Sequence, residues 1–403
     1  MSDVERKSGG SEPVSLSARS QGIGHAPASD EQRSRFRDLT AAQMPASYAI
    51  SLDSYRRGGT DAFLRSAPAG LTPQPMKGFE TTYVNIVDYI VRITHRIWEE
   101  KDIGYIYDTY SHDCAVWDDI GLQYGRDKIV ADTIQLNNAF PDIRIVADEV
   151  IWAGDDAVGF HTSHRTRIFG TNTGFSRYGP PTGRRVQFWC LANCVARDNE
   201  IFHEHVVYDT VSLLQQIGFD PVETARRFAN AGGDTLLPDN FRGAEGKRML
   251  GQNKPANLPI PHDPIEDPAE FVRSAFHAIW NRRNLAAVEQ VYSSNILVQA
   301  TAGRIYRGIG QLQSFILSML ASFPDLHLTV DDIYWMGNSV EGALIAIRWS
   351  MTGTHDGPGR YGPPTGKSIS VWGITHWVVD GGRVQKEWIM FNEFGMLIQL
   401  QQD

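Results

Sequence analysis

Three polar side chains recur at alternate positions near the end of a predicted strand over residues 200–211. His203, His205 and Asp209 share one face of that strand, because successive side chains of a strand point to opposite faces. A carboxylate beside imidazoles can transfer protons near neutral pH, since burial raises the pKa of an aspartic acid and histidine titrates near neutrality. The same residue types can also ligate zinc or iron. The pattern leaves three readings open: acid/base catalysis, a metal site, or a polar strand face without chemistry.

A second polar row lies on the predicted strand over residues 157–168. His161 and Arg165 share a face of this strand, whereas His164 points to the opposite face. An arginine in a pocket could hold a carboxylate or stabilise an enolate. The alternative for Arg165 is a structural ion pair with Glu204, and for both histidines it is a place in the core or on a strand face.

Helices precede these strands in the sequence. Ile86, Ile90, Ile93 and Ile97 recur at spacings of four, three and four, which predicts one apolar face of a helix. Shorter helices are expected over residues 104–110 and 127–139, and strands over 144–153, 157–168, 185–196 and 200–211, with a tight hairpin at 198–199. Helices followed by a run of strands predict an α+β fold, in which a curved antiparallel sheet wraps over the N-terminal helices.

The chain contains this pattern twice. The heptapeptide RYGPPTG occurs at 177–183 and again at 360–366, a shift of 183 residues. At the same shift Phe-Pro-Asp at 140–142 meets 323–325, and Trp189 meets Trp372. The register predicts two copies of one fold. We assign residues 1–78 to a partly disordered N-terminal arm, 79–231 to domain 1, 232–266 to a linker and 267–403 to domain 2.

Composition limits the partners. The 403 residues include 38 Lys and Arg against 47 Asp and Glu, a formal net charge of −9, without the basic footprint of a nucleic-acid-binding protein. No apolar run reaches the roughly 20 residues that span a bilayer. The three cysteines are too few for a disulfide framework, and we expect reduced thiols and a cytoplasmic protein. We therefore expect a small-molecule substrate, no nucleic acid, no membrane, and a possible homo-oligomer.

The segment GTHDGPGRYGPPTGKSISVWGITHWVVDGGRVQKEWIMFNEFGMLIQL at 353–400 resembles the SnoaL-like polyketide cyclase family, within the nuclear-transport-factor-like superfamily. Domain 1 carries a variant with GTNTG, PPTGR and LLQQIG. The resemblance implies two tandem cone-shaped α+β barrels with one pocket each. Its cyclases close rings by an intramolecular aldol reaction without a cofactor, using an aspartate of the last long strand as acid/base.

The position that matches this aspartate is Asp209 in domain 1 and Asn392 in domain 2. Because an amide does not exchange a proton near neutral pH, we expect chemistry in domain 1 alone, with domain 2 a degenerate copy that covers the first or builds an interface. The expected catalytic residues are Asp209, His205, His203, His161 and Arg165.

The copies differ in length at Trp117-Asp118-Asp119, where the resemblance places the mouth of the cone, and a solvated turn is the alternative there. The expected substrate contacts are Trp117, Asp118, Tyr124, His164 and Trp189. The leading hypothesis is a cofactor-independent enzyme acting on a small carbonyl-containing substrate by cyclisation, isomerisation, elimination or hydrolysis, with no bound metal. The alternatives are a non-catalytic binding or assembly module and a metal-dependent lyase or oxygenase that uses His203, His205 and Asp209.

Overall fold

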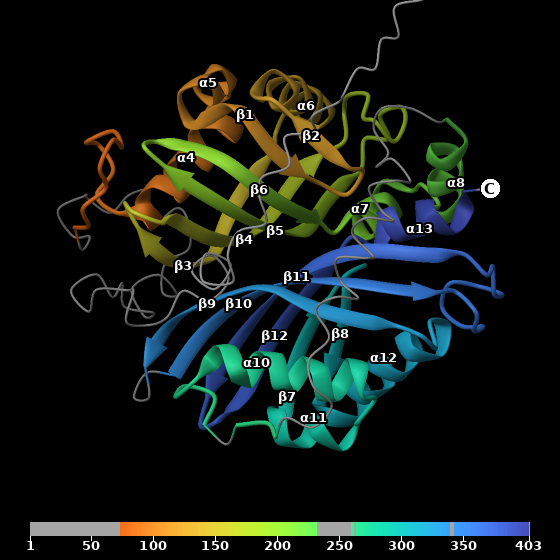
Figure 1. Cartoon of the computed structure of the whole chain (residues 1–403). Helices are drawn as coiled ribbons and strands as arrows, with labels where there is room; N and C mark the ends of the chain where they lie inside the picture. The colour runs from red at the N-terminus through yellow and green to blue at the C-terminus, as the bar shows by residue number, and fades with distance from the viewer. Residues whose placement is uncertain (1–72, 232–258, 262, 339–341, 403) are drawn as a thin grey trace, which may run out of the picture.

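The computed structural model describes residues 73–231, 259–261, 263–338 and 342–402. Within these residues two α+β domains lie back to back, with the helices between residues 86–139 and 268–322 on the outside of the molecule (Figure 1). The helices between residues 210–231 and 393–401 lie side by side at one end, where the two domains meet. The proposed N-terminal arm and linker lie almost wholly outside the described residues. No helix in the described part of the chain combines the length and the apolar character that crossing a membrane requires.

Domain 1 runs from α4 to α8. Its elements are α4 (Ile86–Trp98), the 3-10 helix η4 (Ile103–Tyr105), α5 (Ile106–Thr109), β1 (Tyr110–Trp117), β2 (Leu122–Tyr124), α6 (Arg126–Ala139), β3 (Arg144–Asp155), β4 (Gly159–Thr171), β5 (Arg185–Arg197), β6 (Glu200–Tyr208), α7 (Thr210–Ile217) and α8 (Pro221–Ala231). Apolar residues of α4 are buried as its spacing predicts, and the Asn85 side chain caps its first turn by accepting a hydrogen bond from the Asp88 N–H.

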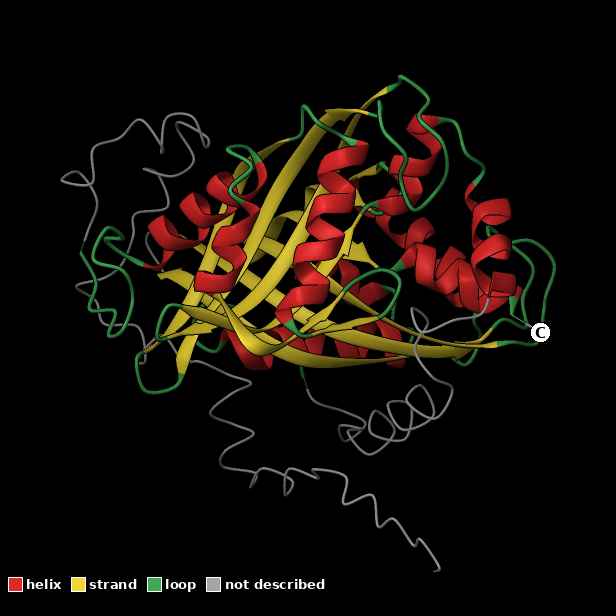
Figure 2. Cartoon of the chain, turned by 90° about the horizontal axis from the view of Figure 1, so that it is seen from above, coloured by secondary structure: helices red, strands yellow, loops and turns green. Residues whose placement is uncertain are grey.

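Domain 2 repeats the order. Its elements are α10 (Pro268–Phe276), the π-helix η5 (His277–Asn281), α11 (Ala286–Val291), β7 (Tyr292–Ala300), β8 (Arg304–Arg307), α12 (Gly308–Ser322), β9 (His327–Asn338), β10 (Gly342–Thr354), β11 (Ser368–Asp380), β12 (Arg383–Phe391) and α13 (Glu393–Gln401). Figure 2 shows the long strands running beneath the helices.

Each domain contains one six-stranded sheet, ordered β2-β1-β6-β5-β4-β3 in domain 1 and β8-β7-β12-β11-β10-β9 in domain 2. Most pairs are antiparallel, as expected, but β1 pairs with β6 and β7 with β12 in parallel, so the sheets are mixed. The sheets are curved and open rather than closed barrels. Asp198 and Asn199, with φ of 52° and 71°, form the predicted hairpin between β5 and β6.

The two sheets pack through their outer faces, which point away from each domain's own helices. At the centre lie Leu191 and Val207 from domain 1 and Ile374 and Met390 from domain 2, all fully buried. Ile374 is the counterpart of Leu191 at the 183-residue shift, and Met390 is the counterpart of Val207. Equivalent residues of the two domains therefore meet, and the contact is nearly two-fold symmetric. Domain 2 thus covers the centre of the outer face of the domain 1 sheet, where Leu191 and Val207 are fully buried.

Truncating the centre of this contact is expected to destabilise the chain. Leu191→Ala should lower the free energy of unfolding by about 2–5 kcal/mol, because the cavity lies between two packed sheets that cannot close around it. Urea unfolding of the full chain measures the change. Leu317→Ala, at a side chain that is 49% exposed, is the control and should stay within about 0.5 kcal/mol of the wild type. Equal effects of the two substitutions would contradict the assigned interface.

Candidate functional site

Domain 1 encloses a cavity of about 150 Å³ between the inner face of its sheet and helices α4 and α6. Apolar side chains of Ile90, Ile93 and Ile97 on α4 form one wall. The opposite wall is the sheet, where His164 and Glu204 face inward. A cavity of this size can hold a ligand of about the size of benzene.

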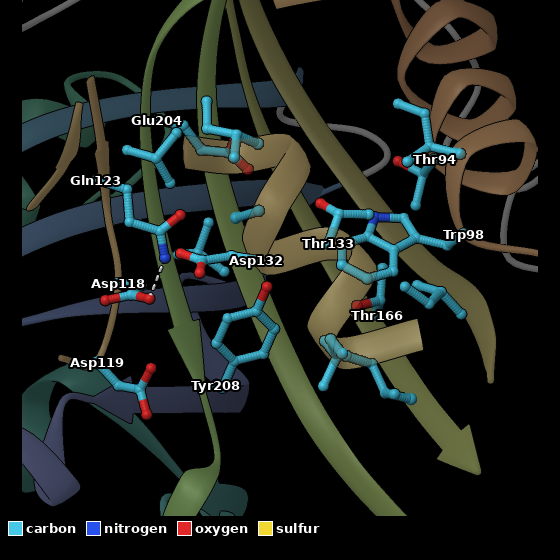
Figure 3. Close-up of a pocket in the computed structure, with 18 of the residues that line it drawn as sticks. Thr94, Trp98, Asp118, Asp119, Gln123, Asp132, Thr133, Thr166, Glu204 and Tyr208 are labelled. Carbon is cyan, nitrogen blue, oxygen red and sulfur yellow. Dashed lines mark hydrogen bonds between the residues drawn. The ribbon is translucent and has the colours of Figure 1, made fainter. Parts of the chain in front are cut away.

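Polar groups gather on one side of this cavity. Figure 3 shows Glu204, Gln123, Asp132 and Tyr208 around the same space, with Trp98 and Thr133 on another side. The carboxylates come from separate elements, since Glu204 lies on β6, Asp118 follows β1 and Asp132 lies on α6.

Glu204 is the carboxyl group of the sheet wall. It accepts a hydrogen bond of 3.1 Å from the Tyr110 hydroxyl. Burial raises its pKa to about 7, although hydrogen bonds from Tyr110 and Cys194 oppose the rise. A carboxyl group with this pKa can either take up or release a proton near neutral pH.

His164 faces the cavity from β4, and its Nε2 has no hydrogen-bond partner among the described residues although it is buried. Burial lowers its pKa to about 3, with the neighbouring His376 adding to the shift, so the imidazole stays neutral at physiological pH. Along the sheet, His164 is opposite Ala192, which is opposite Val206. The small Ala192 side chain therefore leaves space between His164 and strand β6.

The aspartates that line the cavity are held by their neighbours. Asp118 accepts hydrogen bonds from the Ile120 and Gly121 N–H groups at 2.9 Å and pairs with Arg177 at 3.3 Å. Arg177 also lies 3.6 Å from Asp132. Arg177 belongs to the repeated RYGPPTG segment, so this segment contributes a side chain to the cavity lining in addition to forming a turn.

Asp119 is buried next to Asp118. It accepts hydrogen bonds from the Thr210 hydroxyl at 2.7 Å and the Tyr178 hydroxyl at 3.2 Å. Burial and the charge of Asp118 raise its pKa to about 6, against the effects of Arg177 and of these hydroxyl groups.

Two of the residues that were expected to contact the substrate, Asp118 and His164, line the cavity. The expectation that Asp209 faces it is wrong. Strand β6 ends at Tyr208, three residues earlier than predicted, and Asp209 is the N-cap of α7. The inward residues of β6 are Glu204, Val206 and Tyr208, so His203 and His205 point to the outer face.

The remaining expected residues also lie away from the cavity. Arg165 pairs with Asp148 at 2.7 Å and Glu149 at 2.8 Å, not with Glu204, and it lies 3.4 Å from the Trp388 ring of domain 2. His161 and Trp189 contact aromatic rings of domain 2, namely Tyr334 and Trp388, Trp117 stacks on His205, and Tyr124 is 65% exposed. These side chains serve the interface or the surface because they lie outside the inner face of the sheet.

The three ligands that the alternative metal site would use do not converge. His203 and His205 are 4.8 Å apart by ring centroids, but the Asp209 oxygens accept backbone hydrogen bonds from domain 2. Among the described residues, no three His, Cys, Asp or Glu side chains are grouped as metal ligands would be. The three cysteines, all described, are buried and free of disulfide bonds.

Domain 2 fills the equivalent space. Thr166 and Cys194, which line the cavity of domain 1, correspond at the 183-residue shift to Trp349 and Trp377. Both tryptophans are fully buried, and the Trp377 indole N–H donates to Glu387 at 2.9 Å. Glu387 is the counterpart of Glu204, so in domain 2 an indole covers the carboxyl group that borders open space in domain 1.

This difference predicts how to close the cavity. Cys194→Trp should abolish binding of phenol, a small uncharged ring, because the indole would occupy the space as Trp377 does in domain 2. Isothermal calorimetry with phenol measures binding, and circular dichroism verifies the fold.

The reciprocal substitution is the control. Trp377→Cys should lower the free energy of unfolding by about 3 kcal/mol, while phenol binding in the cavity of domain 1 should stay unchanged. Unchanged phenol affinity in Cys194→Trp would show that the ligand does not enter the cavity.

Comparison with known proteins supports one family. The model of the SnoaL-like polyketide cyclase family matches residues 89–217 and 270–400, one match in each domain. A search of curated proteins found no match.

Solved structures of similar proteins each match a single domain. One from Jannaschia sp. CCS1, assigned as a SnoaL-like polyketide cyclase, is 15% identical, covers 37% of this chain and 98% of its own, and has a TM-score of 0.29. IdmH from Streptomyces antibioticus, assigned as a polyketide cyclase, is 22% identical with coverage of 33% and 98% and the same TM-score. A SnoaL-like polyketide cyclase from Agrobacterium tumefaciens is 17% identical, with coverage of 33% and 97% and a TM-score of 0.28. Because the family model matches both domains over more than half of the sequence, the chain belongs to the SnoaL-like polyketide cyclase family as a tandem duplication.

Proposed function

We propose that domain 1 is a cofactor-independent acid/base enzyme that acts on a small carbonyl compound by cyclisation or isomerisation. The observation that carries the proposal is Glu204, a buried carboxyl group beside open space in domain 1, whose counterpart Glu387 is covered by Trp377. Membership of the cyclase family agrees with this class of reaction. The proposal replaces Asp209 by Glu204 as the acid/base.

The residues suit proton transfer next to a carbonyl group. The Glu204 carboxylate takes a proton from the carbon beside the carbonyl, so the C–H bond breaks and its electron pair forms an enolate. His164 is neutral, and an imidazole with its proton on Nε2 donates a hydrogen bond to the enolate oxygen. In an aldol closure the enolate carbon attacks a second carbonyl of the same molecule, and the new alkoxide takes the proton back from Glu204.

The geometry leaves room for a ring between these groups. His164 and β6 are separated by β5, and two strand steps of 4.7–4.9 Å place them about 10 Å apart. A planar substrate between them would contact the isoleucines of α4 with one face.

A second candidate function is ligand binding without catalysis. The pair of Glu204 and Tyr110 recurs in the filled domain as Glu387 and Tyr292, whose hydroxyl lies 3.4 Å from that carboxylate. This recurrence favours a structural role for the pair. Replacing Glu204 and, separately, Glu387 by glutamine distinguishes catalysis from ligand binding without catalysis.

Glu204→Gln should abolish carbonyl chemistry. We expect the wild type to accelerate exchange of the α-hydrogens of cyclopentanone, a ketone with six heavy atoms, with deuterated water, with a rate that rises with pH around the Glu204 pKa of about 7 as the base loses its proton. The glutamine variant should lose about 100-fold or more of this acceleration, because an amide cannot accept the proton. Nuclear magnetic resonance of the ketone measures the exchange.

The matched control is Glu387→Gln, at the covered carboxyl of domain 2, where burial also raises the pKa to about 7. It should leave exchange unchanged. Exchange in Glu204→Gln at the wild-type rate, with phenol still bound, would favour the binding function instead.

The charge of the cavity selects the ligand. Asp118, Asp119, Asp132 and Glu204 border it, while the nearby cation Arg177 is already paired with two of these carboxylates. An anionic ligand would meet repulsion without a free partner. We therefore expect an uncharged or cationic substrate.

This expectation can be tested with rings of similar size. Phenol should bind at least about tenfold more tightly than benzoate at pH 7, because the second ligand brings a carboxylate to an acidic wall. Calorimetry at two salt concentrations measures both, and the gap should narrow as salt screens the charges. Benzylamine is the cationic comparison. Benzoate binding as tightly as phenol would contradict an acidic cavity.

A further inference from the structure

A tight turn of domain 2 holds the carboxylate of Asp209. Ala302 and Gly303 both have a φ of 64°, which aims their successive N–H groups at one point. The Ala302 N–H donates to Asp209 Oδ1 at 2.6 Å and the Gly303 N–H donates to Oδ2 at 2.9 Å. Consecutive N–H groups in this conformation form a concave anion site. We call these two hydrogen bonds the interdomain clamp.

The clamp arises where the two copies differ. In domain 1 the turn after β1 is capped from within, because Asp118 accepts the Ile120 and Gly121 N–H groups. Domain 2 has Ala300 at the position of Asp118 in its shorter turn, so no carboxylate of its own stands there. The N–H groups of its turn take Asp209 of domain 1 instead.

Asn392, the counterpart of Asp209, makes a different contact. Asn392 caps its own helix α13 by accepting a hydrogen bond from the Gly395 N–H at 2.7 Å. The interface is therefore nearly symmetric in its apolar centre and asymmetric at the clamp.

Asp209 is connected to the cavity through the next residue. As the N-cap of α7, Asp209 sets where the first turn of this helix begins, and its carboxylate also accepts from the Ser212 N–H at 3.4 Å. Thr210 follows directly and donates its hydroxyl to Asp119 at 2.7 Å. Asp119 lines the cavity.

We propose that Asp209 is a positioning residue, through which the turn of domain 2 fixes the start of α7 and keeps the Thr210 hydroxyl on Asp119 in the cavity of domain 1. Domain 2 then contributes to the cavity although none of its described side chains borders the cavity. The inference takes the cavity as the site of the proposed function and adds a role for domain 2 that this function does not require.

The charged neighbours of each group define the readout. Asp119 is surrounded by Asp118, Arg177, Tyr178 and Thr210, and the hydrogen bond from Thr210 lowers its pKa. Asp209 faces the two N–H groups of the clamp, the Ser212 N–H and the charge of Glu393. If the clamp positions Thr210, loss of the clamp must raise the pKa of Asp119 in the same way as loss of the hydroxyl.

The test follows the ionisation of Asp119 itself. Full-length protein labelled with carbon-13 at the aspartate carboxyl groups is titrated by nuclear magnetic resonance, and the Asp119 signal is identified by its absence in Asp119→Asn. Thr210→Val should move the midpoint up by about one pH unit, the value of one hydrogen bond, and Thr210→Ser should restore it. Asp209→Asn should give the same upward shift, because its amide NH₂ group would face one of the two N–H donors.

Two further variants complete the design. Asp209→Ser keeps a side-chain cap on α7 without the two-oxygen clamp, and it replaces Asp209→Asn where that variant does not fold. Asn392→Ser alters the matched cap in domain 2 and should leave the Asp119 midpoint in place. An unchanged midpoint in the folded Asp209 variants, whatever their melting temperature, overturns the proposal, as does an unchanged midpoint in Thr210→Val. The experiment needs no turnover, so its failure is separate from failure of ketone exchange.

Discussion

The burial of one sheet's outer face against the other is the constraint on which the rest of the structure depends. Leu191 and Val207 at its centre would be exposed in an isolated domain 1, as would the Arg165 side chain that now lies on Trp388. Once this face is committed to packing, a ligand can be bound only on the inner face, between sheet and helices. The positions of Glu204 and His164 follow from that division.

The inner faces of the two sheets differ in the size of their side chains. Large indole rings at Trp349 and Trp377 stabilise domain 2 by filling its interior, whereas Thr166 and Cys194 leave the same volume open in domain 1. Burying an indole contributes favourable free energy that an open cavity forgoes. The interior of domain 2 is thus filled by large side chains, whereas domain 1 retains the open space that the proposed reaction would use.

The duplication, the helices α4 and α6, the four long strands β3 to β6 and the hairpin at Asp198 could be predicted from sequence periodicity and from the 183-residue shift. Strands β1 and β2, which lie between those two helices, were not predicted. Which residues of β6 face the interior could not be predicted from the sequence. Alternation shows which residues share a face, but each face of this strand carries both apolar and polar side chains, so hydropathy does not distinguish inside from interface. The N-cap role of Asp209 also ended the strand before the residue that was expected to complete the catalytic row.

A better signal was present in the sequence. Positions where one copy has a small residue and the other a tryptophan, such as Cys194 and Trp377, mark the volume that only one domain leaves empty. Of the expected contacts, Asp118 and His164 are at the cavity, and the first stood out because the copies differ in length there.

The joining of both domains in one polypeptide has a consequence for the interface between them. Two separate chains must find each other, and their association weakens on dilution, whereas linked domains meet at an effective concentration set by the connection. Such an interface can afford imperfect contacts, among them the buried His161 Nε2, which has no hydrogen-bond partner among the described residues. It also allows the turns of the two domains to diverge, because domain 1 packs against domain 2 of the same chain and not against another domain 1.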